Sequence, residues 1–404
     1  MRRVVITGIG VISAVGNSVG EFWSNIAEGR PGIGPITRAD VSTLRFQNAA
    51  EVKGFDESEH FDEKSLIWLD PFAHYGIVAA RQAIADSGLD YDDELRGRTG
   101  VITGSCLGGK TTEDDLFYKL YAEGKQRHQP VAIPRAMANA VASHVSMEFG
   151  LTGATFTTAT ACSSANHAIG QAFWLVRQGT LQMAVAGGSE APICFGHLKA
   201  WETMRVVSPD TCRPFSADRT GMVLGEGAAM FTLETLEAAR SRGARIYAEI
   251  VGAGMSADAH HLTMPLAHGA AKAMRLALED GKIDNTEVGY INAHGTATQA
   301  NDPMESAAIR EVFGDRTSEI GVSSTKSMHG HTLGAAGAIE AAATVLGLAN
   351  DTLPPNINFT APDPECPLNI VANSAREQVT EAALSNSFAF GGLNAVLAFR
   401  RWKG

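Results

Sequence analysis

Hydrophobic and polar positions along the chain form two successive series of strand-like and helix-like segments. In the strand-like segments apolar residues run together or alternate with polar ones, and in the helix-like segments they recur every three or four positions. Strands that alternate with helices favour an α/β fold with a parallel-rich sheet, and the division near residue 250 suggests a duplicated architecture. The predicted strands are 3–7, 98–104, 182–187, 228–234, 247–254, 290–293, 320–323, 383–388 and 395–401. The predicted helices are 70–87, 136–149, 236–242, 269–278, 303–313 and 335–349.

Two segments rich in glycine or proline are predicted to form loops. After a strand over 3–7, a glycine loop follows in which Gly8, Gly10 and Ser13 nearly match the dinucleotide-binding fingerprint. Ser13 replaces the third glycine and no helix clearly opens at Gly10, so a nicotinamide site is disfavoured. The same glycines interrupt the apolar run that a signal peptide needs. Residues 194–221 are also predicted to be loop-rich.

The central stretch of the pattern is a threonine-rich run, 155–160, that changes at Cys162 into a helical pattern ending at Gly179. Cys162 is therefore predicted at a strand-to-helix junction, beside free backbone N–H groups and the positive end of the helix dipole. This setting favours thiolate over thiol and makes Cys162 a candidate nucleophile. The remaining cysteines are expected to be buried apolar side chains.

Composition and charge narrow the class of protein. The chain has 404 residues, 45% of them hydrophobic and 19% charged, as ordinary globular proteins do. A net charge of −11 argues against a nucleic-acid partner. The five cysteines are scattered and odd in number, and none has zinc spacing, so we expect no disulfide framework, no metal and a reducing, cytoplasmic location. No membrane span is expected, because Glu340 interrupts the most apolar segment.

Two of the twelve histidines lie next to predicted strands, where α/β folds gather reactive groups. His294 directly follows the strand 290–293, and His331 precedes the Gly- and Ala-rich helix 335–349. Together with Cys162 they suit acyl chemistry, in which a thiolate attacks a thioester and neutral imidazoles donate hydrogen bonds to a second carbonyl.

Neighbouring groups extend this candidate site. Backbone N–H groups near Cys162 and in the Phe390-Gly391 turn are placed to hold an oxyanion. Lys326 and Glu305 are candidates for an ion pair that fixes one imidazole. A purely structural salt bridge between them is an equally good interpretation.

Short motifs over nearly the whole chain carry a resemblance to one enzyme family. They occupy 3–10, 160–164, 213–215, 225–227, 292–296, 326–335 and 386–394. None is specific singly, but together they are: the chain resembles the β-ketoacyl acyl-carrier-protein synthases of the thiolase-like superfamily, of the elongating type II kind. The resemblance implies a thiolase-like five-layered α/β/α/β/α sandwich built from two similar halves, 1–250 with the nucleophile and 251–404 with both histidines.

The resemblance also implies the reaction, a decarboxylating Claisen condensation in fatty acid, polyketide or specialised lipid elongation. An acyl group held as a thioester on Cys162 would join malonyl-acyl carrier protein to give β-ketoacyl-acyl carrier protein. His294 and His331 would bind the malonyl carbonyl and support decarboxylation, and Lys326 with Glu305 would support His331. No cofactor is implied, because the phosphopantetheine arrives on the carrier protein.

Further roles follow from the same resemblance. The N–H groups of Cys162 and Phe390 would form the oxyanion hole, and Phe390 would gate the acyl pocket. Substrate-binding positions are implied for Thr296, Thr298, Leu107, Phe390, Gly391 and Asp258. The threonines would contact the phosphopantetheine arm, and Leu107 would form part of the acyl-pocket wall.

The resemblance implies an acyl carrier protein as partner and a homodimer formed through the strand near 182–187 and its neighbours. A heterodimer with a chain-length partner, of which this chain is the active half, is the alternative. The family's basic docking helix is thinned here, which leaves Lys64, Arg127 and Arg205 as candidate docking residues. The chain also departs from the family at His329, where threonine is usual.

Three rival functions are open at this point. A CoA-dependent thiolase shares the fold and nucleophile but uses a second cysteine in a Cys-Gly-Gly turn, where this chain has Phe390. A non-catalytic chain-length subunit usually lacks the nucleophile, which this chain retains. A cysteine hydrolase uses one base histidine and an orienting amide, and would not explain both His294 and His331.

Overall fold

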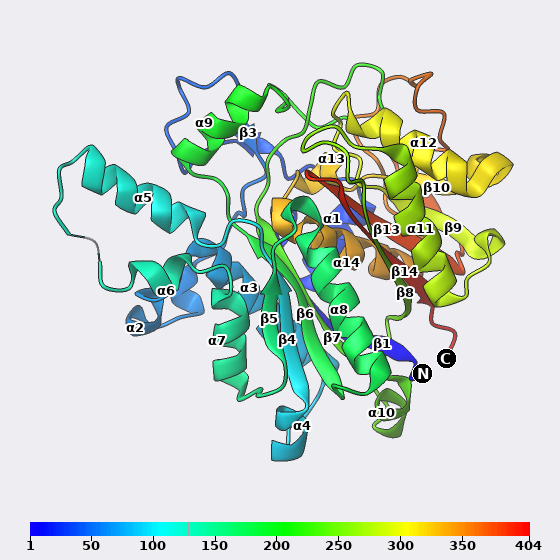
Figure 1. Ribbon diagram of the computed structural model, residues 1–404, viewed down its shortest axis with the longest axis horizontal. Coiled ribbons are helices and arrows are strands. Elements are labelled where there is room, and N and C mark those ends of the chain that lie inside the picture. The colour runs from blue at the N-terminus through cyan, green and yellow to red at the C-terminus, as the bar shows by residue number, and fades with distance from the viewer. Residues whose placement is uncertain (128) are drawn as a thin grey trace.

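A ten-stranded sheet runs through the protein, of which the computed structural model describes residues 1–127 and 129–404 (Figure 1). Its strands follow the order β10-β9-β13-β14-β8-β1-β7-β6-β4-β5. Their bounds are β1 Val4–Ser13, β4 Thr99–Gly104, β5 Thr155–Thr158, β6 Met183–Glu190, β7 Gly227–Thr235, β8 Ala248–Ala257, β9 Val288–Asn292, β10 Gly321–Ser323, β13 Ala382–Ala389 and β14 Leu393–Arg401.

The sheet consists of two halves with the same pairing pattern. One half consists of three parallel strands, β5, β4 and β6, followed by two antiparallel ones, β7 and β1. The other half has the same pattern, with the parallel strands β10, β9 and β13 followed by the antiparallel strands β14 and β8. The halves meet where β1 pairs with β8 at Val4 to Ile6. The predicted duplication of the α/β series is therefore a duplication of strand order.

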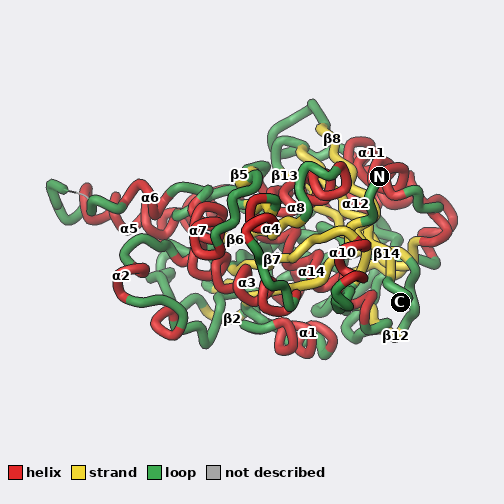
Figure 2. Tube along the Cα trace, turned by 90° about the horizontal axis from the view of Figure 1, so that it is seen from below, coloured by secondary structure: helices red, strands yellow, loops and turns green. Residues whose placement is uncertain are grey.

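Helices cover both halves in the layers that the resemblance implied. α8 (Ser164–Gln178) and α14 (Ala336–Ala349) lie between the two half-sheets and share one apolar core with them. α3 (Pro71–Ser87) and α7 (Ala140–Phe149) cover the outer face of the first half, and α11 (Ala267–Gly281) and α12 (Asn301–Phe313) cover the second. Figure 2 shows the strands with helices on either side, so the five-layered sandwich is confirmed.

The composition of α14 explains its central place. Ala, Gly and Leu dominate it, and every residue from Ala336 to Leu348 is buried. A helix that is apolar all round is stable only when it is enclosed on all sides. Its small side chains also permit close contact with α8, since a Cβ on Gly337 would lie 2.4 Å from the Asn166 amide oxygen.

The N-terminal glycines do not form the loop expected after Thr7. They lie inside β1, which continues to Ser13. A Cβ on Gly8 would lie 2.0 Å from the carbonyl oxygen of Ala83, and one on Gly10 would lie 1.9 Å from that of Ala79, both in α3. These glycines therefore permit close packing of a helix on a strand, and the prediction of a loop was wrong.

Shorter elements surround the sandwich. The α-helices are α1 Val19–Ala27, α2 Glu63–Leu66, α4 Asp93–Gly97, α5 Lys110–Tyr121, α6 Ala132–Ala136, α9 Phe195–Met204, α10 Leu236–Ser241 and α13 Lys326–His329. The remaining elements are the strands β2 Gly34–Pro35, β3 Asn48–Ala49, β11 Thr352–Leu353 and β12 Arg376–Glu377 and the 3-10 turns η1 Glu57–Glu59, η2 Ala161–Ser163, η3 Asn285–Glu287, η4 Gly314–Ser318 and η5 Leu333–Ala335. α9 lies in the segment predicted to be loop-rich, and α5 with α6 projects from the body (Figure 1).

The strand expected to form a dimer contact is not available for pairing. β6, which contains the predicted strand 182–187, lies between β4 and β7 and is bonded on both sides. The edges of the large sheet are β5 and β10.

No helix in the described part of the chain has the length and apolarity needed to cross a membrane.

Candidate active site

Cys162 lies in the 3-10 turn η2, between the edge strand β5 and the central helix α8. The turn begins with Ala161 in the left-handed region, at φ 50°, and is closed by side chains that bond its own backbone. The Ser163 hydroxyl donates to the Thr160 carbonyl at 2.9 Å, and the Ser164 hydroxyl accepts from the Thr160 N–H at 2.9 Å. The Thr- and Ser-rich sequence thus forms a tight turn that presents a buried thiol at the start of the helix.

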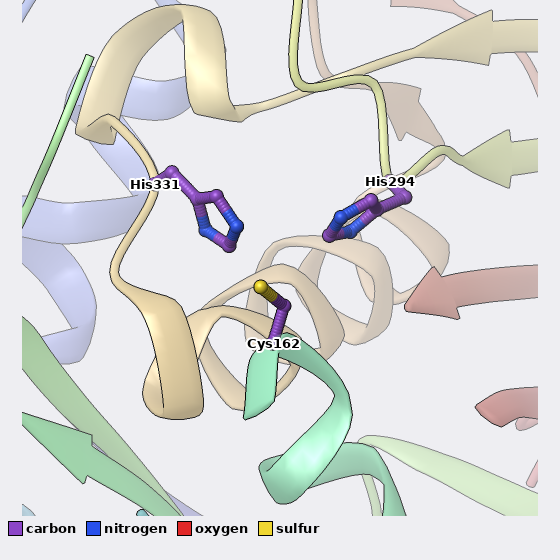
Figure 3. A group of neighbouring side chains, drawn as sticks. All are labelled: Cys162, His294 and His331. Atoms are coloured by element: carbon purple, nitrogen blue, oxygen red, sulfur yellow. The ribbon is translucent and has the colours of Figure 1, made fainter. Parts of the chain in front are cut away.

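The three predicted reactive side chains converge. The sulfur of Cys162 and one ring nitrogen from each of His294 and His331 all lie within 4.8 Å of one another. All three side chains are buried and point toward a shared space (Figure 3). They come from η2, from the loop after β9 and from the loop after α13, so both halves of the fold contribute.

Hydrogen bonds fix the tautomers of both imidazoles. The Lys326 ammonium lies 3.3 Å from Nδ1 of His294, and the N–H of Leu333 donates to Nδ1 of His331 at 3.2 Å. Each partner is a donor, so each Nδ1 must accept and each Nε2 carries the proton. Burial lowers the pKa of both histidines well below its usual range, with Lys326 adding to the effect. The site therefore presents two neutral N–H donors.

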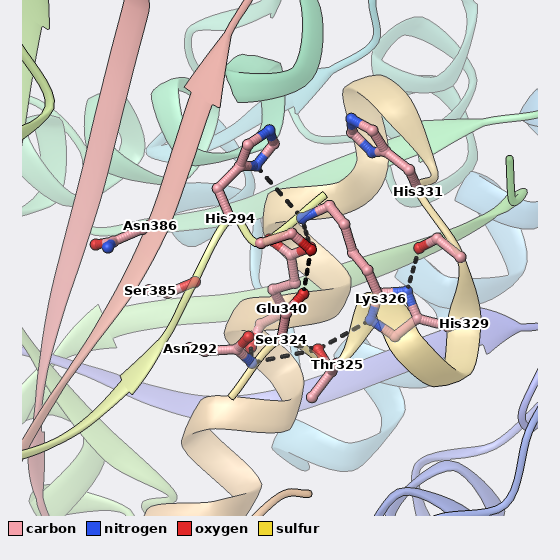
Figure 4. A network of polar contacts seen from close by, with 12 residues as sticks. Asn292, His294, Ser324, Thr325, Lys326, His329, His331, Glu340, Ser385 and Asn386 are labelled. Atoms are coloured by element: carbon pink, nitrogen blue, oxygen red, sulfur yellow. Dashed lines mark hydrogen bonds and ion pairs between the residues drawn. The ribbon is translucent and has the colours of Figure 1, made fainter. Parts of the chain in front are cut away.

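The buried Lys326 pairs with Glu340 and not, as we expected, with Glu305. Its ammonium forms an ion pair with the carboxylate of Glu340 in α14, and both side chains are fully enclosed (Figure 4). Burial raises the pKa of Glu340 to about 7, although Lys326 opposes that shift. Lys326 also contacts His294, whereas the resemblance implied that it supports His331.

Glu305 instead holds the backbone of the turn that carries His294. Its carboxylate accepts from the N–H groups of His294 and Gly295, both at 2.8 Å, and from the Asn386 side-chain amide at 3.1 Å. Both members of the predicted pair lie near the histidine motifs in the sequence. The lone acid within the apolar helix α14 was a signal in the sequence for the actual partner.

Burial affects the pKa of the Cys162 thiol more strongly than its place at the start of α8 does. It raises the pKa of Cys162 to about 11, so the expectation of a favoured thiolate was wrong for the free protein. Lys326 and the backbone N–H groups of Phe390 and Cys162 act in the opposite direction. These two N–H groups are the predicted oxyanion donors, and they lie close enough to the sulfur to bond it.

A cavity of about 330 Å³ opens above the three reactive side chains. Thr296, Thr298 and Phe390 line it, as the resemblance implied, and so does the exposed Arg205. Lys64, on α2, and Arg127 are exposed but do not line this cavity.

The other implied substrate residues lie outside the cavity lining. Leu107 packs in a separate apolar cluster, and its N–H donates to Glu190 at 3.2 Å. Asp258 accepts from the N–H of Leu266 at 2.9 Å and so braces a loop of the cavity wall. Gly391 donates its N–H to the carbonyl of Leu262 at 2.7 Å, which joins that loop to the Phe390 turn.

Trp201 of α9 also lines the cavity, and the sequence reasoning missed it. Its indole N–H donates to Nε2 of His197 at 2.7 Å, and its ring centroid lies 6.1 Å from that of Phe390. Trp201 and His197 are one helical turn apart, but a segment with proline and charge did not suggest the helix that brings them together. Phe390 therefore rests against an aromatic side chain that is itself held in place.

Comparisons of this chain with family models, with individual proteins and with solved structures all identify the same family. Residues 1–239 match the family described as the N-terminal domain of beta-ketoacyl synthase, and residues 247–360 match its C-terminal domain. Nodulation protein E of a Rhizobium sp. strain is 46% identical over 400 residues, with 99% of both chains covered. The 3-oxoacyl-[acyl-carrier-protein] synthase 2 of Staphylococcus aureus is 41% identical over 409 residues, with 100% of this chain and 99% of that one covered. The solved structure of the ishigamide ketosynthase/chain length factor matches with both chains completely covered, 38% identity and a TM-score of 0.95.

Proposed function

Because the chain belongs to the β-ketoacyl synthase family, we propose a specific division of roles among the residues of its site. The enzyme is a ketosynthase that condenses an acyl thioester with a malonyl unit on an acyl carrier protein, with loss of CO₂. The observation that carries our assignment is the cluster of one thiol and two neutral imidazoles, with each Nδ1 already occupied by a donor.

In the first half-reaction the sulfur of Cys162 attacks the acyl thioester. A new C–S bond forms, the thiol proton passes to the departing phosphopantetheine sulfur, and the old C–S bond breaks. The N–H groups of Cys162 and Phe390 stabilise the oxyanion of the tetrahedral intermediate. Burial keeps the thiol protonated in the free enzyme, so the thiol itself supplies the proton that the departing sulfur takes up; both Nε2 atoms already carry protons and do not accept it.

In the second half-reaction the Nε2–H groups of His294 and His331 donate to the carbonyl of the malonyl thioester. The bond to the carboxylate breaks, CO₂ leaves, and the electron pair forms an enolate whose oxygen the two donors stabilise. The enolate carbon then attacks the acyl group on Cys162, the C–S bond breaks, and the sulfur leaves as a thiolate that takes up a proton from solvent. The reaction needs no redox cofactor and no metal.

A thiol and two imidazoles are also a zinc-type ligand set, but their surroundings favour the catalytic interpretation. A metal would need the lone pair of each Nε2, which requires the proton on Nδ1. Lys326 and the N–H of Leu333 offer only protons to those Nδ1 atoms. The thiolase alternative is disfavoured because Phe390 occupies the turn where that class uses its second cysteine.

We further propose that the enzyme works as a dimer paired along β5. This strand is an edge of the sheet, it directly precedes the nucleophile turn, and Phe156 on it is exposed. A homodimer is our first assignment. A heterodimer with a chain-length partner is the second, since one solved relative is a ketosynthase/chain length factor. The molar mass of the purified chain by light scattering separates a homodimer from a monomer that awaits a partner.

The carrier protein meets the enzyme near Arg205 in our proposal, because this exposed cation lies at the cavity. Arg205→Glu is expected to raise the KM for carrier-bound malonate and to leave the KM for a free malonyl thioester unchanged.

The free cysteines fit the reducing cytoplasm that we propose as the location of the enzyme.

The assignment of half-reactions is tested with Cys162→Ala. The variant should lose acyl transfer completely, because no sulfur remains to hold the acyl group, and should still decarboxylate malonyl-acyl carrier protein. Mass spectrometry of the intact protein after incubation with acyl carrier thioester measures the first step, and release of CO₂ measures the second. Retained acyl labelling of the variant would place the nucleophile elsewhere.

A further inference from the structure

His329 is a fully buried histidine that does not itself face the cavity. It is the last residue of α13, two positions before His331. Its Nδ1 lies 2.9 Å from the carbonyl oxygen of Gly330, and its Nε2 lies 3.0 Å from the hydroxyl oxygen of Thr325. A carbonyl only accepts, so Nδ1 carries the proton and Nε2 accepts from the Thr325 hydroxyl.

The hydrogen-bonded chain continues from Thr325 to the other histidine loop. Because the hydroxyl of Thr325 gives its proton to His329, its oxygen accepts from the side-chain amide of Asn292 at 3.3 Å. Asn292 is the last residue of β9, two positions before His294. A single run of donors and acceptors, Asn292 to Thr325 to His329 to Gly330, therefore connects the backbones that carry the two reactive imidazoles. Figure 4 shows its first three members.

Gly330 has a backbone conformation that few other residues could adopt. It has φ +67° and ψ −175°, a conformation that favours glycine, and a Cβ there would lie 2.9 Å from the Cβ of Ala50. Glycine leaves the peptide before His331 with the greatest freedom to rotate. The ring of His329 restrains the carbonyl of that peptide, while Val223 accepts from the N–H of His331 at 2.7 Å.

We propose that His329 is a positioning residue for the decarboxylation step. Through the Gly330 carbonyl it sets the direction of His331, and through Thr325 and Asn292 it couples that direction to the His294 loop. Both Nε2–H groups then converge on one carbonyl oxygen. This inference rests on the proposed function, because it assigns His329 to the step in which both histidines donate. Burial keeps His329 neutral, with its pKa lowered to about 3, so its donor and acceptor roles stay fixed.

Substitutions of His329 separate its two hydrogen bonds. His329→Phe keeps an aromatic ring at this position and removes both bonds. We expect kcat for decarboxylation to fall by about tenfold or more, with KM little changed, as expected for lost hydrogen bonds in a buried site. His329→Asn retains a donor near the Nδ1 position and should recover most of kcat. Thr325→Val removes the hydroxyl that joins Nε2 of His329 to Asn292 and leaves the bond from His329 to Gly330 in place. It should cost several-fold, and Thr325→Ser should restore the rate.

Acylation of Cys162 and thermal stability are measured on the same variants, and His74→Phe is the matched control. His74 is also buried, with its pKa lowered to about 4, but it lies on α3 away from the cavity lining. We expect His329→Phe and Thr325→Val to lower the rate of decarboxylation while the rate of acylation stays within about threefold of wild type. His74→Phe should leave both rates unchanged.

Three results overturn the proposal. The first is an equal loss of both half-reactions that follows the melting temperature across the variants. The second is full decarboxylation by His329→Phe. The third is no difference between Thr325→Val and Thr325→Ser. If wild type and Cys162→Ala both fail to decarboxylate malonyl-acyl carrier protein, the proposed function itself is wrong, which distinguishes that failure from the failure of this inference.

Discussion

The two halves of the fold contain the same turn at the start of their central helices, and only one of these turns is reactive. η2 precedes α8 and η5 precedes α14, and each begins with a non-glycine residue in the left-handed region, Ala161 at φ 50° and Leu333 at φ 48°. The next position is Cys162 in the first half and Gly334 in the second. The duplicated backbone therefore carries a nucleophile in one copy and no side chain in the other.

The surroundings of Gly334 explain the difference. The carboxylate of Glu190 accepts from the N–H groups of Gly334 at 3.1 Å and Cys106 at 2.8 Å. A Cβ on Gly334 would lie 2.4 Å from that carboxylate and 2.5 Å from the Cys106 nitrogen. In the second half a buried acid accepts from the N–H that corresponds to the proposed oxyanion donor of Cys162 in the first. Backbone N–H groups at the start of a helix can stabilise an oxyanion only where no group of the protein already accepts their hydrogen bonds.

The second half supplies donors in place of a nucleophile. Between β10 and η5 it inserts α13, whose Lys326 is buried against Glu340 and His294. Burial keeps the pKa of the neighbouring imidazoles low and the rings neutral, the lysine adds to this effect, and its ammonium fixes the tautomer of His294. In our account the first half holds the acyl group and the second half activates the malonyl group.

The largest expected effect comes from Lys326→Met, which removes the cation from the second half. It leaves Glu340 buried without its partner, and loss of one member of a buried pair costs about 3–5 kcal/mol in the free energy of unfolding. The double variant Lys326→Met/Glu340→Leu should recover most of that loss, because no charge remains buried. Chemical denaturation of the three proteins measures this. A single variant within about 1 kcal/mol of wild type would contradict the role of the pair.

Next in size is the effect of His294→Ala and His331→Ala on decarboxylation. Each removes one oxyanion donor, so each should lower kcat by about two orders of magnitude. Acylation of Cys162, the reaction of the first half, should fall much less. Mass spectrometry of samples quenched at successive times measures the two steps separately. Equal losses in both would show that the two halves of the fold do not have separate roles in the reaction.

A smaller effect is expected from Gly334→Ala, which adds a side chain at the position equivalent to the nucleophile. The methyl group overlaps Glu190 and Cys106, and overpacking of this kind costs about 1–3 kcal/mol. Gly20→Ala is the control, because a Cβ there has no neighbour within 4 Å. Thermal unfolding should separate the two variants, and equal melting temperatures would mean that the second turn has room for a side chain.

The alternation of strands and helices predicted an α/β fold with reactive groups at strand exits, and the family resemblance implied the five layers and a shared site for Cys162, His294 and His331. The sequence pattern misplaced the N-terminal glycines, since glycine marks a loop and close packing equally well in a sequence. The partner of Lys326 was missed because Glu305 and Glu340 both lie on other elements, and only the packing of α14 against α13 brings Glu340 to the ammonium. The protonated thiol depends on burial, which a local pattern at the helix start does not reveal.

The most direct test of this account is the pH dependence of decarboxylation by Cys162→Ala. The pKa of both histidines is lowered, so they remain neutral donors as the pH falls past the ordinary histidine value of about 6.5. We predict a constant rate of CO₂ release from malonyl-acyl carrier protein between about pH 8 and pH 5.5, with circular dichroism to confirm that the variant stays folded. A rate that changes about tenfold per unit below pH 6.5 would show that an imidazole titrates there, and would contradict the account.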